Sequence, residues 1–299
     1  MALQYKDITE FITGTVDVFA TEVAKTGSFA FRLARSRIRD EMDHKFVPNS
    51  MTPHVYQTEK NEQLVNAIGV NLVSAMFTEA FEKRLVDMAI SIEDIEEATQ
   101  VYYEQNFGDL SSEAIRLGQV SARANQSRLL DSMNQQALTK NILGKAMDGM
   151  VTDLQNEVTV DQMIKNAEHR IRARFDNYLR PLAASSLQTS SRELNEIYAE
   201  GFSLSWVNYV RRTSAADRRP FCAAHESKLN GSVTYHVDEV SREFPNWNGG
   251  KWDGQIPNTD SSSIWTQAGG YSCLHSFEYV KADKVSASSR ARARSKGYI

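Results

Sequence analysis

The chain has 299 residues, with 34 lysines and arginines against 38 aspartates and glutamates, and a formal net charge of −4. Its length suits one large domain or two ordinary ones, and its 24% of charged residues together with 9% of aromatic residues exclude a wholly disordered chain. The mildly acidic balance argues against a protein coated in basic surface for nucleic acid.

Neither a membrane span nor a secretory signal is expected. No run of about 18 apolar residues occurs, and the first residues lack a basic stretch followed by an apolar one. The two cysteines are too few for a disulfide-built scaffold. We therefore expect a soluble, folded protein of a reducing compartment.

The first 200 residues carry the pattern of α-helices. Ser91 and the acids after it predict a helix start, and residues 106–112 predict a break before the next helix. Capping-box spacing opens a helix over about 159–178, and Pro181 begins another that runs to about Gly201. An apolar stripe of helical period begins with four residues: Leu64, Ile68, Leu72 and Met76. Methionines in this region suit packing against other subunits, namely Met133, Met147, Met150 and Met163.

After Gly201 the pattern changes to that of short strands. Residues 204–211 alternate with a period of two, and the Asn-Gly pair at 230–231 predicts a hairpin turn. A loop rich in glycine, proline and tryptophan over 243–270 precedes a second alternating run over 271–280. The predicted fold is therefore α+β and predominantly α-helical, with a small loop-rich α+β domain after a helical N-terminal region.

Net charge is distributed unevenly along the chain. Residues 281–299 hold six basic residues and one acid, a balance of +5, which leaves −9 for the other 280 residues. We expect a helical region over 1–155 for subunit interaction, a small domain over 156–280 and a basic flexible arm over 281–299, because the arm has too little apolar mass to order alone.

Two groups of basic residues are candidates for contact with nucleic acid or an acidic partner. In the arm the alternative is a merely solubilising terminus, and on the earlier helix it is an ordinary solvated face. The arm group consists of Lys284, Arg290, Arg292, Arg294 and Lys296, and the earlier group of Arg32, Arg35 and Arg39.

Four residues of the C-terminal region form a sufficient set for a metal ion. Cys222 and His225 lie beside Pro220 in a turn region, whereas Cys273 and His275 lie two apart on a predicted strand and so leave the same face. Two sulfurs and two imidazoles suit tetrahedral zinc, which would stabilise a loop-rich fold rather than catalyse. Reduced, packed cysteines with ordinary histidines and a Cys222–Cys273 disulfide are the alternative interpretations.

The same residues allow an enzymatic interpretation, in which a cysteine nucleophile is activated by a histidine base. No third group that would orient the histidine stands out in the sequence. We therefore expect no catalytic residues, and keep a Cys/His-dependent hydrolase or nuclease as an alternative.

Several short motifs together resemble the Mu F-like phage head morphogenesis family of minor head proteins, over about residues 160–280. They are Ser190-Ser-Arg-Glu-Leu-Asn, Trp206-Val-Asn-Tyr-Val, Asp217-Arg-Arg-Pro-Phe-Cys-Ala-Ala-His, Leu229-Asn-Gly-Ser-Val and Tyr271-Ser-Cys-Leu-His. The chain departs from the family in having Cys-x-His for Cys-x-Cys and Gly269-Gly-Tyr in place of a proline just before Cys273, after a long Trp/Gly insertion.

The resemblance implies a structural, portal-associated protein of the bacteriophage capsid, acting in head assembly, DNA packaging or ejection and present in the virion after assembly in the host cytoplasm. Its implied partners are the portal protein, capsid subunits or other head components, and packaged DNA through the C-terminal arm. It implies no catalytic activity. A neck or head–tail connector adaptor that uses the same helices in a ring is the alternative structural role.

Overall fold

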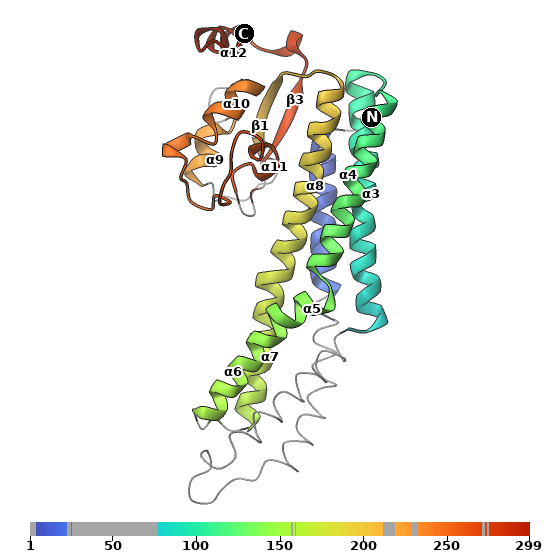
Figure 1. Ribbon diagram of the computed structural model, residues 1–299, viewed down its shortest axis with the longest axis vertical. Helices are drawn as coiled ribbons and strands as arrows, with labels where there is room; N and C mark the ends of the chain where they lie inside the picture. The colour runs from blue at the N-terminus through green and yellow to red at the C-terminus, as the bar shows by residue number, and fades with distance from the viewer. Residues whose placement is uncertain are drawn as a thin grey trace, which may run out of the picture. The chain divides into compact units, whose positions relative to one another are not determined.

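The computed structural model describes residues 4–22, 25, 77–156, 158, 160–211, 219–228, 232–270, 273 and 275–299. Within these ranges the chain is mostly helical with one small antiparallel sheet, as the sequence predicts (Figure 1). Arg32, Arg35, Arg39 and the apolar stripe that begins at Leu64 lie outside the described residues. Among the described helices, none is long and apolar enough to cross a membrane.

The helices before the sheet follow one another with short breaks. Residues 5–22 are helical. The later helices are α3 (Glu79–Phe107), α4 (Ser112–Ser132), α5 (Gln135–Leu138), α6 (Gly144–Gln155), α7 (Val160–Arg174) and α8 (Arg180–Gly201), with π-helical segments η1 (Thr139–Leu143) and η2 (Phe175–Leu179). The predicted break at 106–112 is confirmed, and the Ser111 hydroxyl caps α4 by accepting from the Ala114 amide at 3.1 Å. The predicted start at Ser91 is wrong, because Ser91 is buried in the middle of α3.

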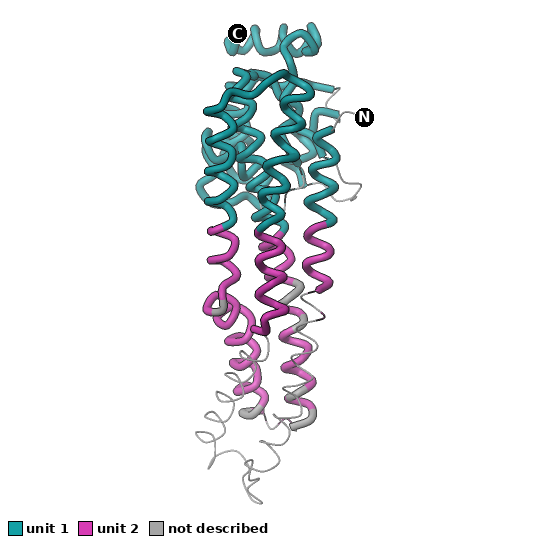
Figure 2. The backbone as a smooth tube through the Cα atoms, turned by 90° about the vertical axis from the view of Figure 1, so that its right-hand side faces the viewer, with its two compact units in different colours: residues 1–14, 90–126, 184–299 teal, residues 15–89, 127–183 magenta. Residues whose placement is uncertain are grey.

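The chain forms two compact units that alternate along the sequence (Figure 2). The first comprises Met1–Gly14, Ile90–Gln126 and Ala184–Ile299, and the second comprises Thr15–Ala89 and Ser127–Ala183. Because the boundaries fall within the long helices, each unit contains helical segments that are distant in sequence.

The second unit is helical where it is described. Between α6 and α7 the Arg170 guanidinium donates to both oxygens of the Asp153 carboxylate at 2.7 and 2.8 Å, a bidentate geometry. Three of the predicted interface methionines are at most 1% exposed, namely Met133, Met150 and Met163. These side chains therefore fill the unit's own core and are not available for packing against other subunits.

The sheet of the first unit has the strand order β2-β1-β3, with all pairs antiparallel. Its strands are β1 (Trp206–Arg211), β2 (Tyr235–His236) and β3 (His275–Val280). Alternation is strict in β3, where His275, Phe277 and Tyr279 are buried, but not in β1, where Trp206 and Val207 are both buried. Because β1 is the central strand and is covered on both faces, its burial does not follow a period of two.

Helix α8 lies along the outer edge of β3 and hydrogen-bonds to it (Figure 1). The Asn195 amide donates to the Phe277 carbonyl at 2.7 Å. The Arg192 guanidinium donates to the carbonyls of His275 and Cys273. Both side chains are at most 6% exposed. They satisfy carbonyl groups that an unpaired strand edge would otherwise leave without partners.

Helix α3 joins the same network. The Tyr103 hydroxyl donates to the backbone carbonyl and the side-chain oxygen of Asn195 at 2.9 and 2.8 Å. Tyr103 also stacks on Phe107 and Phe202. A continuous chain of buried polar contacts therefore runs from α3 through α8 to β3.

Only part of the predicted hairpin lies within the described residues. The turn itself, residues 229–231, lies outside the described residues. The run after it gives only the two-residue β2, which pairs with β1 and leads at once into α10 (Val237–Glu243). His236 caps α10 by accepting from the Asp238 amide, and this cap ends the strand after two residues.

The last segment is folded, which corrects the predicted flexible arm. After the short η4 (Ala282–Lys284), α12 spans Ala287–Ser295 and is capped by the Ser286 hydroxyl. Val285 and Ala293 pack on Trp206 of β1. The Glu239 carboxylate, 2% exposed, accepts from Arg292 and Lys296 at 2.9 and 3.1 Å. The arm cannot order alone, but it orders on this apolar and acidic surface of its own chain.

We expect the Asn195→Ala substitution to lower the free energy of unfolding by about 2 kcal/mol, because it leaves the Phe277 carbonyl and the Tyr103 hydroxyl buried with fewer partners. Urea denaturation measures this change. Asn156→Ala, at an exposed helix end, serves as the control and should change stability by less than about 0.5 kcal/mol. Equal effects of the two substitutions would contradict the role given to Asn195.

Candidate metal centre

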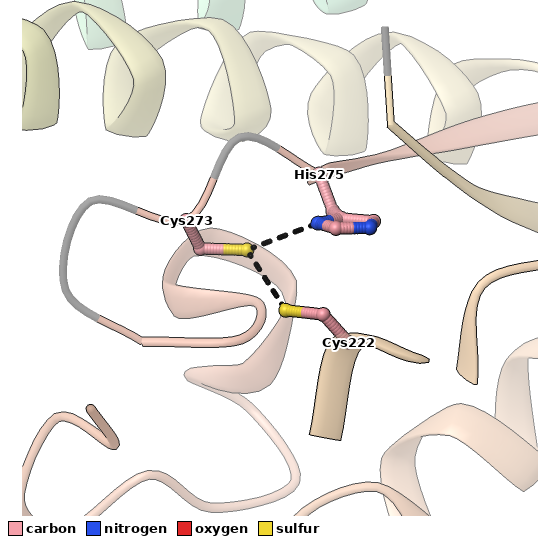
Figure 3. A group of neighbouring side chains, drawn as sticks. All are labelled: Cys222, Cys273 and His275. Carbon is pink, nitrogen blue, oxygen red and sulfur yellow. Dashed lines mark hydrogen bonds between the residues drawn. The ribbon is translucent and has the colours of Figure 1, made fainter. Parts of the chain in front are cut away.

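Three of the four predicted ligands come together in the first unit (Figure 3). Cys222 lies on α9 (Pro220–His225), a single helical turn that begins with proline at its first position. Cys273 precedes β3, and His275 is the first residue of that strand. The strand and the short helix thus present two sulfurs and one imidazole to a common point.

The distances among these donor atoms suit a single ion. Cys222 Sγ lies 3.8 Å from Cys273 Sγ, which lies 3.6 Å from His275 Nδ1, and all three atoms are within 4.8 Å of one another. In a tetrahedral zinc site the bond lengths imply separations of about 3.8 Å between sulfurs and about 3.5 Å between sulfur and nitrogen. The three side chains could therefore hold a metal ion with little movement.

Both cysteines are free thiols in this structure. Their sulfurs are 3.8 Å apart, whereas a disulfide requires about 2.05 Å. The predicted Cys222–Cys273 disulfide is therefore not formed, although the two residues are neighbours as that interpretation required.

Glu226 supports the site from behind the histidine. Its Oε2 lies 3.3 Å from His275 Nε2, and the two side chains are only 4% and 3% exposed. A carboxylate on the outer nitrogen orients an imidazole and fixes which nitrogen faces the ion. Glu226 is not among the predicted site residues, and its only signal in the sequence is that an acid directly follows His225.

Gly269 closes one side of the site. Its amide donates to Cys273 Sγ at 3.3 Å. A Cβ at this position would meet Cys222 Sγ at 2.5 Å, Cys273 Sγ at 2.9 Å and the Tyr209 hydroxyl at 3.0 Å. Only glycine allows the loop backbone to approach the sulfurs so closely.

The two thiols are not equivalent. The hydrogen bond from Cys222 holds the pKa of Cys273 well below its usual range, with further lowering by His275 and Arg192. The same hydrogen bond and burial raise the pKa of Cys222. The lowered pKa favours a thiolate at Cys273, and a thiolate is the form that binds metal ions.

His225 is the predicted ligand that the structure does not bring to the site. Its ring stacks on Phe244 with centroids 3.9 Å apart and also lies against Phe221. Its Nε2 is buried and has no hydrogen-bond partner among the described residues. Cys222 and His225 are three apart on a single turn of helix, so sequence spacing could not separate a ligand from an aromatic-core residue.

The predicted basic contacts of the arm divide into two groups. Lys284, Arg290 and Arg294 are exposed. Arg292 and Lys296 are instead paired with Glu239, and Lys296 also with Glu243. The charge that this segment offers to an outside partner is therefore smaller than its sequence balance of +5.

Comparison of the chain with protein-family models, with curated proteins and with solved structures found no match in any of the three.

Acidification should destabilise the fold through His225. Burial lowers the pKa of His225 to about 4, whereas an unfolded histidine titrates near 6.5. The unfolded chain therefore takes up the proton first, and the free energy of unfolding should fall by about 1–3 kcal/mol as pH drops from 6.5 to 4.

Urea titrations of metal-free protein at several pH values measure this fall. The His225→Phe variant should lose that part of the pH dependence, whereas His169→Phe, at an exposed position of α7, should keep it. A profile that is unchanged in His225→Phe would overturn the prediction.

Proposed function

We propose that this chain is a structural minor head protein of a bacteriophage, which acts in head assembly, DNA packaging or ejection near the portal. The observation that carries this proposal is the convergence of the motifs that resemble the Mu F-like family. The strand Trp206–Arg211, the segment Pro220–His225 and the Cys273-x-His275 pair are separated in sequence but belong to one site in one compact unit.

The burial of the site favours a structural role. Cys222, Cys273 and His275 are between 2% and 5% exposed, and Gly269 lies directly on the sulfurs. A substrate would need an open position beside the nucleophile or ion, whereas a structural ion is enclosed by protein ligands. The chain is therefore proposed to act by forming interfaces and to have no enzymatic activity.

Exposed aliphatic and basic side chains supply candidate interfaces. On α4, Leu117 and Val120 are 43% and 53% exposed and lie three residues apart, hence on one side of the helix. Such a face suits contact with portal or capsid subunits. The exposed Arg290 and Arg294 of α12 are the residues proposed to meet packaged DNA or an acidic neighbour.

The proposed ion is zinc. Two thiolates and an imidazole are ligands that zinc takes readily, whereas Mg²⁺ and Ca²⁺ prefer oxygen. Its role would be to fix α9 and the loop before β3 against the sheet. An alkaline-earth ion is thus disfavoured by the donor atoms themselves.

Association with phage heads tests the structural proposal. The protein should co-sediment with purified heads or virions and be captured by the portal protein. A Leu117→Asp/Val120→Asp variant should lose this association and keep its fold, while Arg116→Glu, an exposed change on the same helix, is the matched control. Absence of the wild-type protein from heads, virions and portal complexes would contradict the proposal.

Metal analysis tests the zinc site separately. We expect about one zinc per chain and a lower melting temperature after chelation, because the ion binds only the folded state. His275→Gln should abolish zinc binding, and the matched His225→Gln should retain it, since only His275 faces the sulfurs. Zinc-free protein, or equal loss in both variants, would overturn this assignment.

A second candidate function rests on Glu226. Cys273, His275 and Glu226 are arranged like the nucleophile, base and orienting acid of a catalytic triad. Cys273 Sγ lies 3.6 Å from His275 Nδ1, and His275 Nε2 lies 3.3 Å from Glu226 Oε2. A burst of p-nitrophenol from p-nitrophenyl acetate, stoichiometric with the chain and absent in Cys273→Ser, would support hydrolysis. The absence of a burst in metal-free protein would remove this candidate.

A further inference from the structure

The three-residue set leaves one position of a tetrahedron open. Among the described residues, no fourth histidine, cysteine or carboxylate belongs to the set. A structural zinc site normally has four protein ligands. Within the described part of the chain, a fourth protein ligand would therefore be a side chain of another kind that lies next to both sulfurs.

Tyr209 of β1 meets this requirement. Its hydroxyl oxygen lies 3.4 Å from Cys273 Sγ and 3.8 Å from Cys222 Sγ. Tetrahedral zinc with an oxygen ligand implies a sulfur–oxygen separation of about 3.5 Å. We propose that Tyr209 is the fourth ligand, so that the centre is a Cys222–Cys273–His275–Tyr209 site. This inference rests on the proposed zinc centre and deepens it.

The fold holds the tyrosine in this position. Tyr209 pairs with Phe277 across the sheet, and its ring stacks on the His275 imidazole with centroids 4.7 Å apart and 14° between the planes. The side chain is fully buried. Gly269 approaches the hydroxyl and both sulfurs from one side. The oxygen is thus placed by a central strand and cannot turn away without opening the core.

Burial and the two neighbouring cysteines raise the pKa of Tyr209 in the metal-free chain, so its phenolate would form only with the ion bound. A divalent ion with two thiolates, one phenolate and a neutral imidazole has a net charge of −1. Three charged side chains of the described residues bond within the site or its surrounding loop: Arg192 and Arg219, which donate to loop carbonyls, and Glu226, which contacts His275; their charges sum to +1. On binding the ion, the two thiols and the phenol release their protons to solvent.

Cobalt titration of the metal-free chain tests the proposal. Thiolate-to-cobalt charge transfer reports the two cysteines, and zinc titration should produce the ultraviolet difference band of an ionised phenol. The Tyr209→Phe variant should keep the charge-transfer band, lose the phenolate band and bind zinc about 100-fold more weakly. Tyr279→Phe, on the neighbouring strand and away from the sulfurs, is the control and should behave like the wild-type chain.

The wild-type phenolate band is measured without any variant, so it decides the question even if Tyr209→Phe folds poorly. A charge-transfer band without a phenolate band, or equal zinc affinity in Tyr209→Phe, would overturn the tyrosine ligand and leave the zinc centre standing. No charge-transfer band in the wild-type chain would overturn both.

Discussion

The first unit depends on a polar seam, the hydrogen bonds from Arg192 and Asn195 of α8 to the carbonyls of Cys273, His275 and Phe277 at the outer edge of β3. A three-stranded sheet is too small to bury its own edges, and an unpaired edge carbonyl in a dry interior costs about 1–3 kcal/mol. Arg192 and Asn195 satisfy these carbonyls from one helix face. The Tyr103 hydroxyl extends the seam to α3. The helical segments and the sheet therefore fold as one unit, although they are far apart in sequence.

The candidate metal centre inherits its geometry from this seam. Arg192 donates hydrogen bonds to the carbonyls of Cys273 and His275. These bonds fix the backbone of the two residues that supply Cys273 Sγ and His275 Nδ1. Glu226 and Gly269 then set the ring and the sulfur from outside. Removing a group that orients a metal ligand in this way commonly lowers metal affinity by about 10–100-fold. The same contacts also seal the sulfurs from solvent.

Periodicity and turn signals located several elements along the chain, although burial follows the predicted alternation only in β3 and not in β1. The break at 106–112, the helix from about Pro181 to Gly201 and both alternating strands correspond to α3, α4, α8, β1 and β3. Tertiary contacts decided the rest. Ser91 has the sequence pattern of a helix cap but lies inside α3. The basic C-terminal segment is folded because it forms an ion pair with Glu239 and packs on Trp206.

The candidate metal centre was likewise predictable from sequence pattern only in part, and tertiary contacts decided the remainder. Cys-x-His on a strand identified a shared face, and the structure keeps both residues there. The sequence does not show that His225 is excluded, since its exclusion arises from Phe244 at the end of α10, which stacks on the His225 ring. The place of Tyr209 beside the ligands is set by the pairing of β1 with β3, and that of Glu226 by the contact of its carboxylate with His275, so neither follows from spacing along the chain.

The contact between Cys222 and Cys273 closes a loop in the chain, because it joins two residues that are 51 positions apart in sequence. Joining such distant points costs chain entropy that rises only with the logarithm of loop length, so doubling the loop adds only about 0.6 kcal/mol. The segment between them has exposed positions such as Pro257 and Asn258. An insertion or deletion at the exposed Pro257–Asn258 turn should therefore cost little chain entropy, whereas one in α9 or β3, which end the loop, would displace the donor atoms.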